Sequence, residues 1–476
     1  MDNATPVRLT GFTALRWAWR LARDPLMTTR HCLGAFGPFV MLAEVLPFTP
    51  PFIRSARPVL LRVPLVLSAG ATFHRELLSD PATWRGVSLL PGGPKNSAAR
   101  RMSLGLTRMT GEAHAYYRRL LVAPLRKGSV DALATGMARL AEVEAASWPV
   151  GEAIDLWEHT RRLMQRLAVE LLFGDTSGQG NLIADRVSRL MAAKWGLRPF
   201  APINLPITSY GRMLQEAELL ERDLLEWARN KRGALDNRDL ASIIVNSPDA
   251  DGCPLDDAAI AGQMPSLFAA ASEASQTVLT WTLLLLALHP RVARELLDEL
   301  CNKLGGTAAS LDGVGHLPYL DAVVKESMRI IPPVPMQMRV AQHDTTIAGH
   351  HAPNGTRAIL NTFLTNRMPN LYPEADVFRP DRWFTIAPST FEFPVFSGGP
   401  YSCPGYWFGL TSVKVALAAL LTRYRMVLPP GARIDYRVQP TMRPLQSLRV
   451  LFHRQDGAFA ATPVTGKIRN LVRLPQ

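Results

Sequence analysis

The sequence predicts a mainly α-helical protein with a small β part, folded around one large domain. Apolar residues recur at helical spacing through most of the middle third of the chain. Short Val- and Leu-rich segments bounded by Gly and Pro, typical of strands, stand nearer the two ends. No low-complexity linker separates these regions. We therefore expect a main domain over residues 58–476, preceded by an irregular or helical extension over residues 1–57.

Composition and charge narrow the class of protein. The chain is 47% hydrophobic and 20% charged, as in ordinary globular proteins. Its four cysteines are far apart and form no zinc-type cluster, which favours a reducing cytoplasm over a disulfide framework or a structural zinc site. The net charge of +13 attracts anionic partners, but the basic residues are dispersed along the chain. We predict no nucleic-acid binding.

One apolar stretch near the N-terminus, residues 33–51, is broken by Gly, Pro and Glu. It lacks the roughly 20 clean apolar residues that a spanning helix needs, so we predict no transmembrane span. It also lies too far from Met1 to be a signal peptide. We expect an irregular segment packed on the core; a weak contact with a membrane surface is the alternative.

Further elements follow in chain order from the same periodicity. Residues 58–68 are predicted as a strand and residues 72–78 as a helix. The next helices are predicted over residues 112–125, 130–146, 156–172, 183–195, 211–231 and 240–246. Between two of them, the interval 196–210 contains three prolines that interrupt a helix, which makes it a candidate mobile lid.

A long helix is predicted from Asp256, a suitable N-cap, to Leu288, with a length of roughly 50 Å. Pro265 is expected to kink or interrupt its first half. The second half is apolar nearly all round, which is typical of a helix buried in the centre of a large core. The remaining elements are helices over residues 292–304, 319–331 and 406–424, and strands up to about residue 361 and over residues 434–452.

The most informative segment runs FSGGPYSCPG from Phe396 to Gly405. Its glycines let the backbone approach a flat cofactor closely, and Phe396 can shield a ligand. Pro404 suits the first position of the following helix, so Cys403 would lie where the helix dipole favours a thiolate. Taken alone, the segment is equally compatible with a buried cysteine in a Gly-rich turn.

This segment resembles the haem-binding loop of the cytochrome P-450 superfamily, whose pattern is F-x-x-G-x-R/H-x-C-x-G. Phe396, Gly399, Cys403 and Gly405 match, whereas Tyr401 stands where the family usually places a basic residue against a haem propionate. The resemblance implies a cytochrome P-450 fold in which haem b binds between the long helix and this loop, with Cys403 as the iron ligand. A tyrosine hydroxyl can still donate one hydrogen bond to a propionate.

Two further segments resemble parts of the same family. Glu326 and Arg329 fall at i,i+3 on one helix face, and Arg382 follows in a segment reading FRPDRW. These three are similar to the family's structural triad, in which one carboxylate accepts hydrogen bonds from two guanidinium groups and fixes the cysteine loop. Taken alone, Glu326 and Arg329 would be interpreted as a surface ion pair.

His114 and Arg118 lie one helical turn apart in a G-x-x-H-x-x-x-R pattern. This pattern resembles the family's third haem-contacting helix in its bacterial form, which implies that the two side chains clamp a propionate. Arg339 resembles a further propionate-binding arginine of the family. As isolated residues, His114 and Arg118 would be interpreted as a solvated basic face.

Residues 270–275 of the long helix, AASEAS, partly resemble the family's A/G-G-x-D/E-T-T stretch, which bends over the oxygen-binding face of haem. Glu273 retains the acid, but Ala274 replaces the threonine that helps to deliver protons. Ser275 is one position late, about 100° further round the helix. We expect proton delivery to use ordered water, Ser275 or a substrate hydroxyl, or else to be impaired.

The resemblance implies a bacterial, soluble type of haem-thiolate monooxygenase. Such an enzyme inserts one atom of O2 into a lipophilic substrate by hydroxylation or epoxidation, with electrons from a ferredoxin- or flavodoxin-like donor. Basic helix ends near Arg118 suit an acidic donor. The substrate pocket is expected to include Phe268, Ala271, Val334 and Met336.

The departures at Ala274 and Tyr401 keep two other functions open. One is a peroxide-driven oxygenase, or a haem-thiolate isomerase or dehydratase that acts on an oxygenated substrate. The other is a haem-binding sensor or carrier that has lost catalysis.

Overall fold

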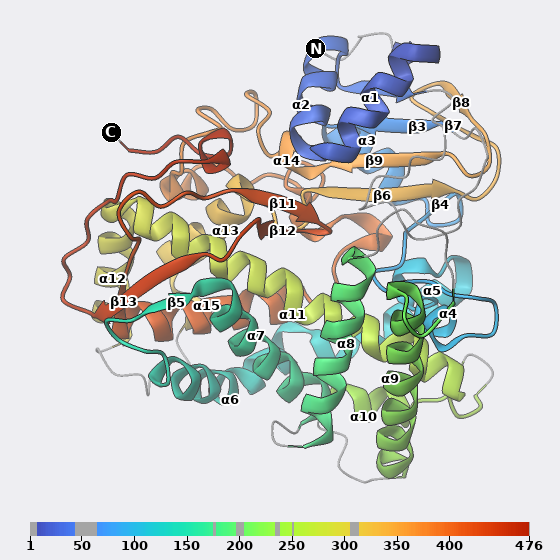
Figure 1. Cartoon of the computed structure of the whole chain (residues 1–476), viewed down its shortest axis with the longest axis horizontal. Helices are drawn as coiled ribbons and strands as arrows, with labels where there is room; N and C mark the ends of the chain where they lie inside the picture. The colour runs from blue at the N-terminus through green and yellow to red at the C-terminus, as the bar shows by residue number, and fades with distance from the viewer. Residues whose placement is uncertain are drawn as a thin grey trace.

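The structure is a computed structural model that describes residues 7–42, 64–174, 178–196, 204–233, 239–249, 252–304 and 314–475. Helices make up the larger part of the molecule, and the main β-sheet lies at one end of it, beside the N-terminal helices (Figure 1). This is the mainly helical architecture with a small β part that the sequence predicts.

The main sheet has six strands, and the N-terminal segment contributes two of them. Its order is β1 (Val7–Leu9), β2 (Phe39–Leu42), β3 (Leu65–Ser68), β9 (Arg357–Asn361), β6 (Met336–Ala341) and β4 (Trp84–Arg85). The β1–β2 and β3–β9 pairs are parallel, and β2 pairs with β3 in the antiparallel sense. Helices α1 (Gly11–Arg23) and α2 (Pro25–Phe36) pack on this sheet through buried side chains such as Leu21 and Leu33.

The expectation that residues 33–51 are irregular was wrong for residues 33–42. The glycine and proline that interrupt the apolar run end one element and start the next, since Gly37 takes φ of 98° at the end of α2 and β2 follows directly. The four residues of β2 are all buried, so a short continuous apolar run was a strand. Residues 43–51 and the expected boundary at residue 57 lie outside the described residues.

The predicted helices between residues 72 and 331 all form, with small shifts at their ends. They are α3 (Ala71–Ser79), α5 (Gly111–Val122), α6 (Lys127–Ala146), α7 (Leu156–Phe173), α8 (Gln179–Gly196), α9 (Ser209–Lys231), α10 (Leu240–Val245), α11 (Asp257–Leu288), α12 (Pro290–Leu304) and α13 (Pro318–Ile330). Two short helices, α4 (Ala98–Met102) and α14 (Thr362–Thr365), were not predicted. Of the candidate lid, residues 197–203 lie outside the described part of the chain.

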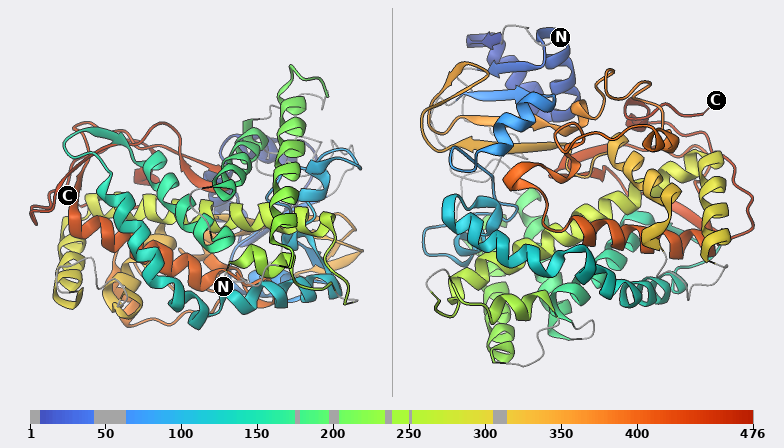
Figure 2. Two further views of the ribbon diagram at one scale, coloured as in Figure 1. Left: turned by 90° about the horizontal axis from the view of Figure 1, so that it is seen from below. Right: turned by 180° about the vertical axis from the view of Figure 1, so that it is seen from behind.

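Helix α11 crosses the centre of the molecule (Figure 2) and is the element around which the others pack. Asp256 caps its N-terminus, with the carboxylate accepting a hydrogen bond from the Ala259 amide at 2.7 Å. The helix is continuous through Pro265, so the expected interruption does not occur. Pro265 and its neighbours Met264 and Phe268 are buried, and this packing outweighs the loss of a single N–H donor.

The C-terminal part holds α15 (Tyr406–Arg423) and the smaller sheets. Strands β10 (Tyr424–Val427), β13 (Arg449–Arg454) and β5 (Ala153–Asp155) form one of them, while β11 (Tyr436–Gln439) pairs with β12 (Thr441–Pro444) and β7 (Thr345–Ile347) with β8 (His350–Ala352). Strands β5 and β10 were not predicted, because each is only three or four residues long and directly adjoins a helix. No helix in the described ranges is long and apolar enough to cross a bilayer.

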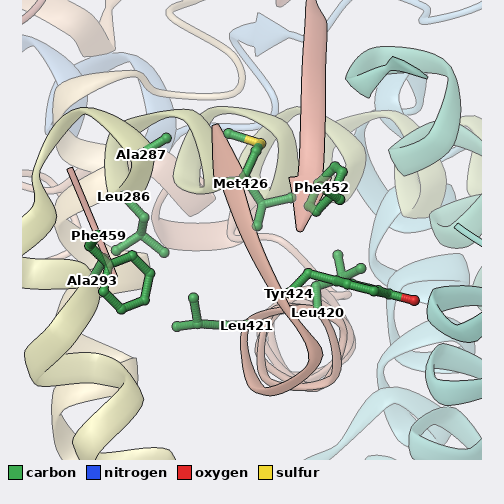
Figure 3. A pocket seen from close by; sticks show the side chains of 10 residues that line it. Leu286, Ala287, Ala293, Leu420, Leu421, Tyr424, Met426, Phe452 and Phe459 are labelled. Atoms are coloured by element: carbon green, nitrogen blue, oxygen red, sulfur yellow. The ribbon is translucent and has the colours of Figure 1, made fainter. Parts of the chain in front are cut away.

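A small apolar cavity lies where α11, α12, α15 and β13 meet (Figure 3). Its lining includes Leu283, Ala293, Leu421 and Phe452, and its volume is about 20 Å³. A space of this size holds no more than one water molecule. It lies near the C-terminal end of α15, roughly a helix length of 27 Å from the cysteine loop, so it is not the predicted site.

Candidate active site

The loop that carries Cys403 is folded tightly on itself. The Cys403 amide donates to the Phe396 carbonyl oxygen at 2.8 Å, and the Phe396 ring packs against Tyr406 with 4.6 Å between ring centroids. Gly399 has φ of +55°, and a Cβ atom there would lie 2.9 Å from the Leu78 carbonyl oxygen. Only glycine therefore fits this position without strain.

The cysteine sulfur lies just ahead of α15. Gly405 is the N-cap and Tyr406 the first helical residue, so the predicted start of this helix at residue 406 is confirmed, and Pro404 lies two positions before it. Cys403 is accessible to solvent as a residue, although protein atoms surround its sulfur. Burial raises the pKa of the Cys403 thiol, whereas the Gly405 amide and the Arg118 charge act to lower it.

Helix α5 brings His114 and Arg118 to this loop, as the resemblance to the family implies. Arg118 donates from Nη1 to the Ser402 carbonyl oxygen at 2.7 Å and from Nη2 to the Ser402 hydroxyl at 2.8 Å. The His114 ring is buried 5.2 Å from the ring of Tyr401. Burial lowers the pKa of His114, and the positive charges of Arg118 and Arg339 lower it further.

Arg339, on β6, is buried at the same place. Its guanidinium lies over the Tyr401 ring, 4.5 Å from the centroid, and Nη1 donates to the Met338 carbonyl oxygen at 2.9 Å. Burial lowers the pKa of Arg339 to about 10, and its Nε has no hydrogen-bond partner. Within the described ranges no carboxylate pairs with Arg339. A buried guanidinium in this state is costly without an anion, so the position suits an anionic ligand group.

Tyr401 does not lie as expected. Its hydroxyl donates to the Trp84 carbonyl oxygen on β4, so its one proton is not available to a propionate. Instead, its ring lies between His114 and Arg339. Tyr401 thus ties the cysteine loop to the main sheet and places a negative ring face against a buried cation.

Replacing Tyr401 with phenylalanine is expected to lower the free energy of unfolding by about 1 kcal/mol, because the buried Trp84 carbonyl loses its donor while the ring stays in place. Chemical denaturation of the purified protein measures this. The matched control is Tyr436→Phe, since the buried Tyr436 hydroxyl has no hydrogen-bond partner in the described structure. Equal midpoints for the two variants would show that the Tyr401 bond contributes nothing.

The structure brings Glu326, Arg329 and Arg382 together, as their motif predicts. Glu326 is fully buried and accepts from Arg329 Nε and Nη2 at 2.8 and 2.9 Å and from Arg382 Nε at 3.0 Å. The Arg379 amide and the Trp383 indole complete the set, and sequence reasoning did not find these two donors. Burial acts to raise the pKa of Glu326, but the hydrogen bonds and charges of the arginines outweigh it, so this pKa is lowered.

The middle of α11 has one open face. Ala270 is exposed and Ala271 and Ala274 are partly exposed, although most of this helix is buried. Ser275 is buried on another side, where a Cβ atom on Gly409 of α15 would lie 3.7 Å from its hydroxyl oxygen. Ser275 therefore faces α15 and does not take the place of a hydroxyl at position 274.

Glu273, also on α11, forms an ion pair with Arg443 of β12. The Arg443 guanidinium lies 5.6 Å from the centroid of the Trp157 ring on α7, and both charged side chains are mostly buried. Sequence reasoning missed Arg443, because 170 residues separate it from Glu273 and no local motif marks it. The pair fixes the acidic side chain beside the open face of α11.

The predicted substrate-pocket residues lie in two different clusters. Phe268 is buried in the main core, and Ala271 packs against that core beside the open face of α11. Met336 instead packs with the residues beneath α1 and α2, where the Thr29 hydroxyl lies 4.0 Å from its sulfur. Val334 is half-buried in the turn before β6. Of the four, Ala271 lies on the open face of α11, and a role for the other three in binding substrate stays a prediction.

A mainly helical fold crossed by one long helix, with an accessible cysteine on a tight glycine-rich loop, is the architecture of a cysteine-ligated haem protein. The family model described as cytochrome P450 matches residues 92–450 of this chain. The chain belongs to the cytochrome P450 family, and it is a haem-dependent monooxygenase.

Individual relatives support the same assignment. The chain is 26% identical over 373 residues to cyclooctat-9-en-7-ol 5-monooxygenase of Streptomyces melanosporofaciens, covering 75% of this chain and 81% of the relative. It is 28% identical over 383 residues to pentalenene oxygenase of Streptomyces avermitilis, covering 77% and 84%. Retinoic acid-bound cyanobacterial CYP120A1 has the same fold, with a TM-score of 0.74, 24% identity, and coverage of 90% of this chain and 94% of that one.

The residues present fit haem. Cys403 is an accessible cysteine on a tight loop, and Arg339 offers a buried positive charge that lacks a carboxylate partner among the described residues. A thiolate is the iron ligand of cytochromes P450, and a guanidinium group suits the carboxylate of a propionate. Both lie at the Cys403 loop, because Tyr401 of that loop contacts Arg339.

Proposed function

We propose that this monooxygenase inserts one oxygen atom from O2 into a lipophilic small molecule, by hydroxylation or epoxidation, using electrons from a ferredoxin- or flavodoxin-like donor. The observation that carries the proposal is the open face of α11, where Ala270, Ala271 and Ala274 present only methyl groups. Such a face favours an apolar substrate. Two relatives are named for an alkenol and an alkene, which makes cyclic terpene-like compounds the first candidates.

In the proposed site, Cys403 would bind the haem iron, and Phe396 covers the loop that carries this cysteine. When bound, the haem would supply oxygen activation, which a thiolate ligand favours by pushing electron density towards O–O cleavage. His114 and Arg339 would bind the propionates. Arg118 holds the loop in place through Ser402, and its positive charge favours the thiolate form of Cys403.

Proton delivery in this proposal depends on Glu273 and water. Ala274 has no hydroxyl, and the Ser275 hydroxyl is buried towards α15. The ion pair with Arg443 holds the Glu273 carboxylate in one orientation at the open face of α11. From there it can pass protons through ordered water to the reacting oxygen.

Glu273→Gln is therefore expected to lower turnover about 100-fold, the usual effect of losing a positioned proton donor, while substrate binding is retained. Steady-state turnover and substrate-induced spectral shifts measure the two. The companion variant Arg443→Met keeps the carboxylate but frees its orientation, so its loss of turnover should be smaller. Equal losses in the two variants would indicate that only the ion pair matters and would contradict a role in proton transfer.

Basic side chains near the cysteine are proposed to receive the electron donor. Arg119 and Arg126 are exposed at the ends of α5 and α6, and Lys127 lies 5.9 Å from the Trp407 ring, which places this surface beside the cysteine loop. Lys127 also pairs with Asp131 at 2.7 Å, so part of its charge is neutralised. The surface is complementary to an acidic redox protein.

Arg126→Glu is expected to slow reduction by such a donor about tenfold at low ionic strength, because it reverses a charge that steers the encounter. The effect should fade as salt screens the interaction. Stopped-flow reduction at two ionic strengths measures this, with Arg139→Glu, an exposed site on the body of α6, as the charge-matched control. A rate in Arg126→Glu that equals the control would contradict steering at this surface.

The function is tested by product formation with isotopically heavy O2. Cyclic terpenes, fatty acids, steroids and aromatic compounds are screened for a shift in haem spin state, and the best ligand is then turned over with an electron donor. One heavy oxygen atom in the product is the expected result. Turnover with peroxide alone and none with donor and O2 would favour a peroxide-driven enzyme instead, and binding without any turnover would favour a sensor.

A further inference from the structure

Helix α1 has a buried face and an exposed face that is itself apolar. Ala14, Ala18 and Leu21 are buried, with Ala14 and Leu21 in the cluster that packs on the main sheet. On the opposite side, Phe12 is 82% exposed and Trp19 is 48% exposed, with Leu15 between them at 36%. Their spacing of three and four residues places these three side chains in one strip along the helix. Large exposed side chains in such a strip indicate a binding surface.

A row of arginines lies beside this apolar strip. Arg16, Arg20 and Arg23 are all exposed, and their spacing of four and three residues gives a second line along the same helix. Arg23 lies over the Trp19 ring, 3.6 Å from its centroid, so the two lines are in contact. None of the ion pairs in the described part of the chain involves these three arginines.

The surroundings of α1 are also basic. Residues 7–42 contain five arginines and one acidic residue, Asp24, whose carboxylate caps α2 by accepting from the Met27 amide at 3.2 Å. In Figure 1 and in the right-hand view of Figure 2, α1 lies at the outer edge of the molecule, beside the sheet and away from the large helical part. This edge can meet a flat surface.

We propose that α1 docks the enzyme on an anionic phospholipid bilayer. Phe12, Leu15 and Trp19 enter the boundary between headgroups and acyl chains, and the arginine row binds the lipid phosphates. Tryptophan is suited to this boundary, because its ring is apolar and its N–H is polar. The strip has three apolar side chains, whereas each side of a stable protein interface contributes about 20 residues or more. Binding to a bilayer requires no interface of that size, because insertion of apolar side chains and attraction between arginines and lipid phosphates both contribute to the affinity.

The test is binding of the intact haem-loaded protein to vesicles, by co-sedimentation. We expect binding to vesicles of phosphatidylcholine mixed with phosphatidylglycerol, weaker binding to phosphatidylcholine alone, and loss of binding at high ionic strength. Phe12→Ser with Trp19→Ser, and separately Arg16→Gln with Arg20→Gln and Arg23→Gln, should each lower the partition coefficient by at least about tenfold. The carbon monoxide spectrum of each variant verifies that the haem site is intact.

Matched control variants remove exposed apolar or arginine side chains from helices other than α1. Val143→Ser with Leu182→Ser removes two exposed apolar side chains from α6 and α8, and Arg139→Gln with Arg212→Gln and Arg229→Gln removes three exposed charges from α6 and α9. Both controls should bind vesicles as the wild type does.

Three outcomes would overturn the proposal. These are no binding of the wild type to anionic vesicles, an equal loss of binding in the controls, and α1 variants that still bind vesicles but are reduced more slowly by an acidic donor. The last outcome would assign α1 to a protein partner.

Discussion

Replacing Cys403 with serine is expected to abolish monooxygenase turnover and the red-shifted carbon monoxide band of a thiolate-bound haem. A serine hydroxyl is not ionised near neutral pH, so it cannot supply the anionic ligand that favours O–O cleavage. The surrounding loop should keep its shape, because its hydrogen bonds run from the Cys403 amide to Phe396 and from Arg118 to Ser402. The loss is therefore one of iron ligation.

The carbon monoxide difference spectrum of the reduced variant and its turnover with an electron donor measure this effect. Cys253→Ser and Cys301→Ser are the controls, since both cysteines are free and exposed, and neither should change the spectrum. A thiolate-type band that survives in Cys403→Ser would show that another sulfur binds the iron. That result would remove the basis of the proposed site.

Glu326→Gln is expected to lower the free energy of unfolding by about 3–5 kcal/mol and to increase haem loss on dilution. The substitution removes the carboxylate that lies between two buried guanidinium groups, and an uncompensated buried charge is costly. Chemical denaturation and the rate of haem transfer to an acceptor protein measure the two effects. The control is Glu374→Gln, which breaks the largely exposed ion pair with Arg379 and should cost about 0–1 kcal/mol.

The effect of Glu326→Gln also depends on pH. Because the folded-state pKa of Glu326 lies below the ordinary value of 4.5, its contribution to stability is fully present above that pH and is lost as the pH falls through the lower folded value. The difference between wild type and Glu326→Gln should therefore shrink in acid. A difference that stays constant down to the acid unfolding transition would contradict the charged form of Glu326.

Most of the helical fold could be predicted, because amphipathic helices carry their own periodicity. In helix α9, for example, buried residues recur every three or four positions along the helix. The errors arose where tertiary pairing decides the structure. The run at β2 is too short to show a period, and its pairing with β1 and β3 makes it a strand. At Pro265 the local rule predicts a break, but burial of the surrounding helix overrides it.

The candidate site could be predicted where its motifs are local. Glu326 and Arg329 stand one turn apart and pair as expected. His114 and Arg118 also stand one turn apart and lie at the Cys403 loop, and their binding of a propionate stays a prediction. Contacts between distant segments could not be predicted. The predicted partner of the Tyr401 hydroxyl was a propionate, whereas the observed partner is the Trp84 carbonyl, whose position depends on where β4 lies in the sheet. The partner of Glu273 is likewise set by the β11–β12 hairpin.

The bond from Tyr401 to Trp84 and the arginine contacts of Glu326 have one further consequence. All of them join protein atoms to protein atoms, and none requires the cofactor. In the protein without haem, these bonds should already hold the cysteine loop in place. Binding of haem should then require little rearrangement of the polypeptide. Reconstitution should consequently leave the far-ultraviolet circular dichroism almost unchanged.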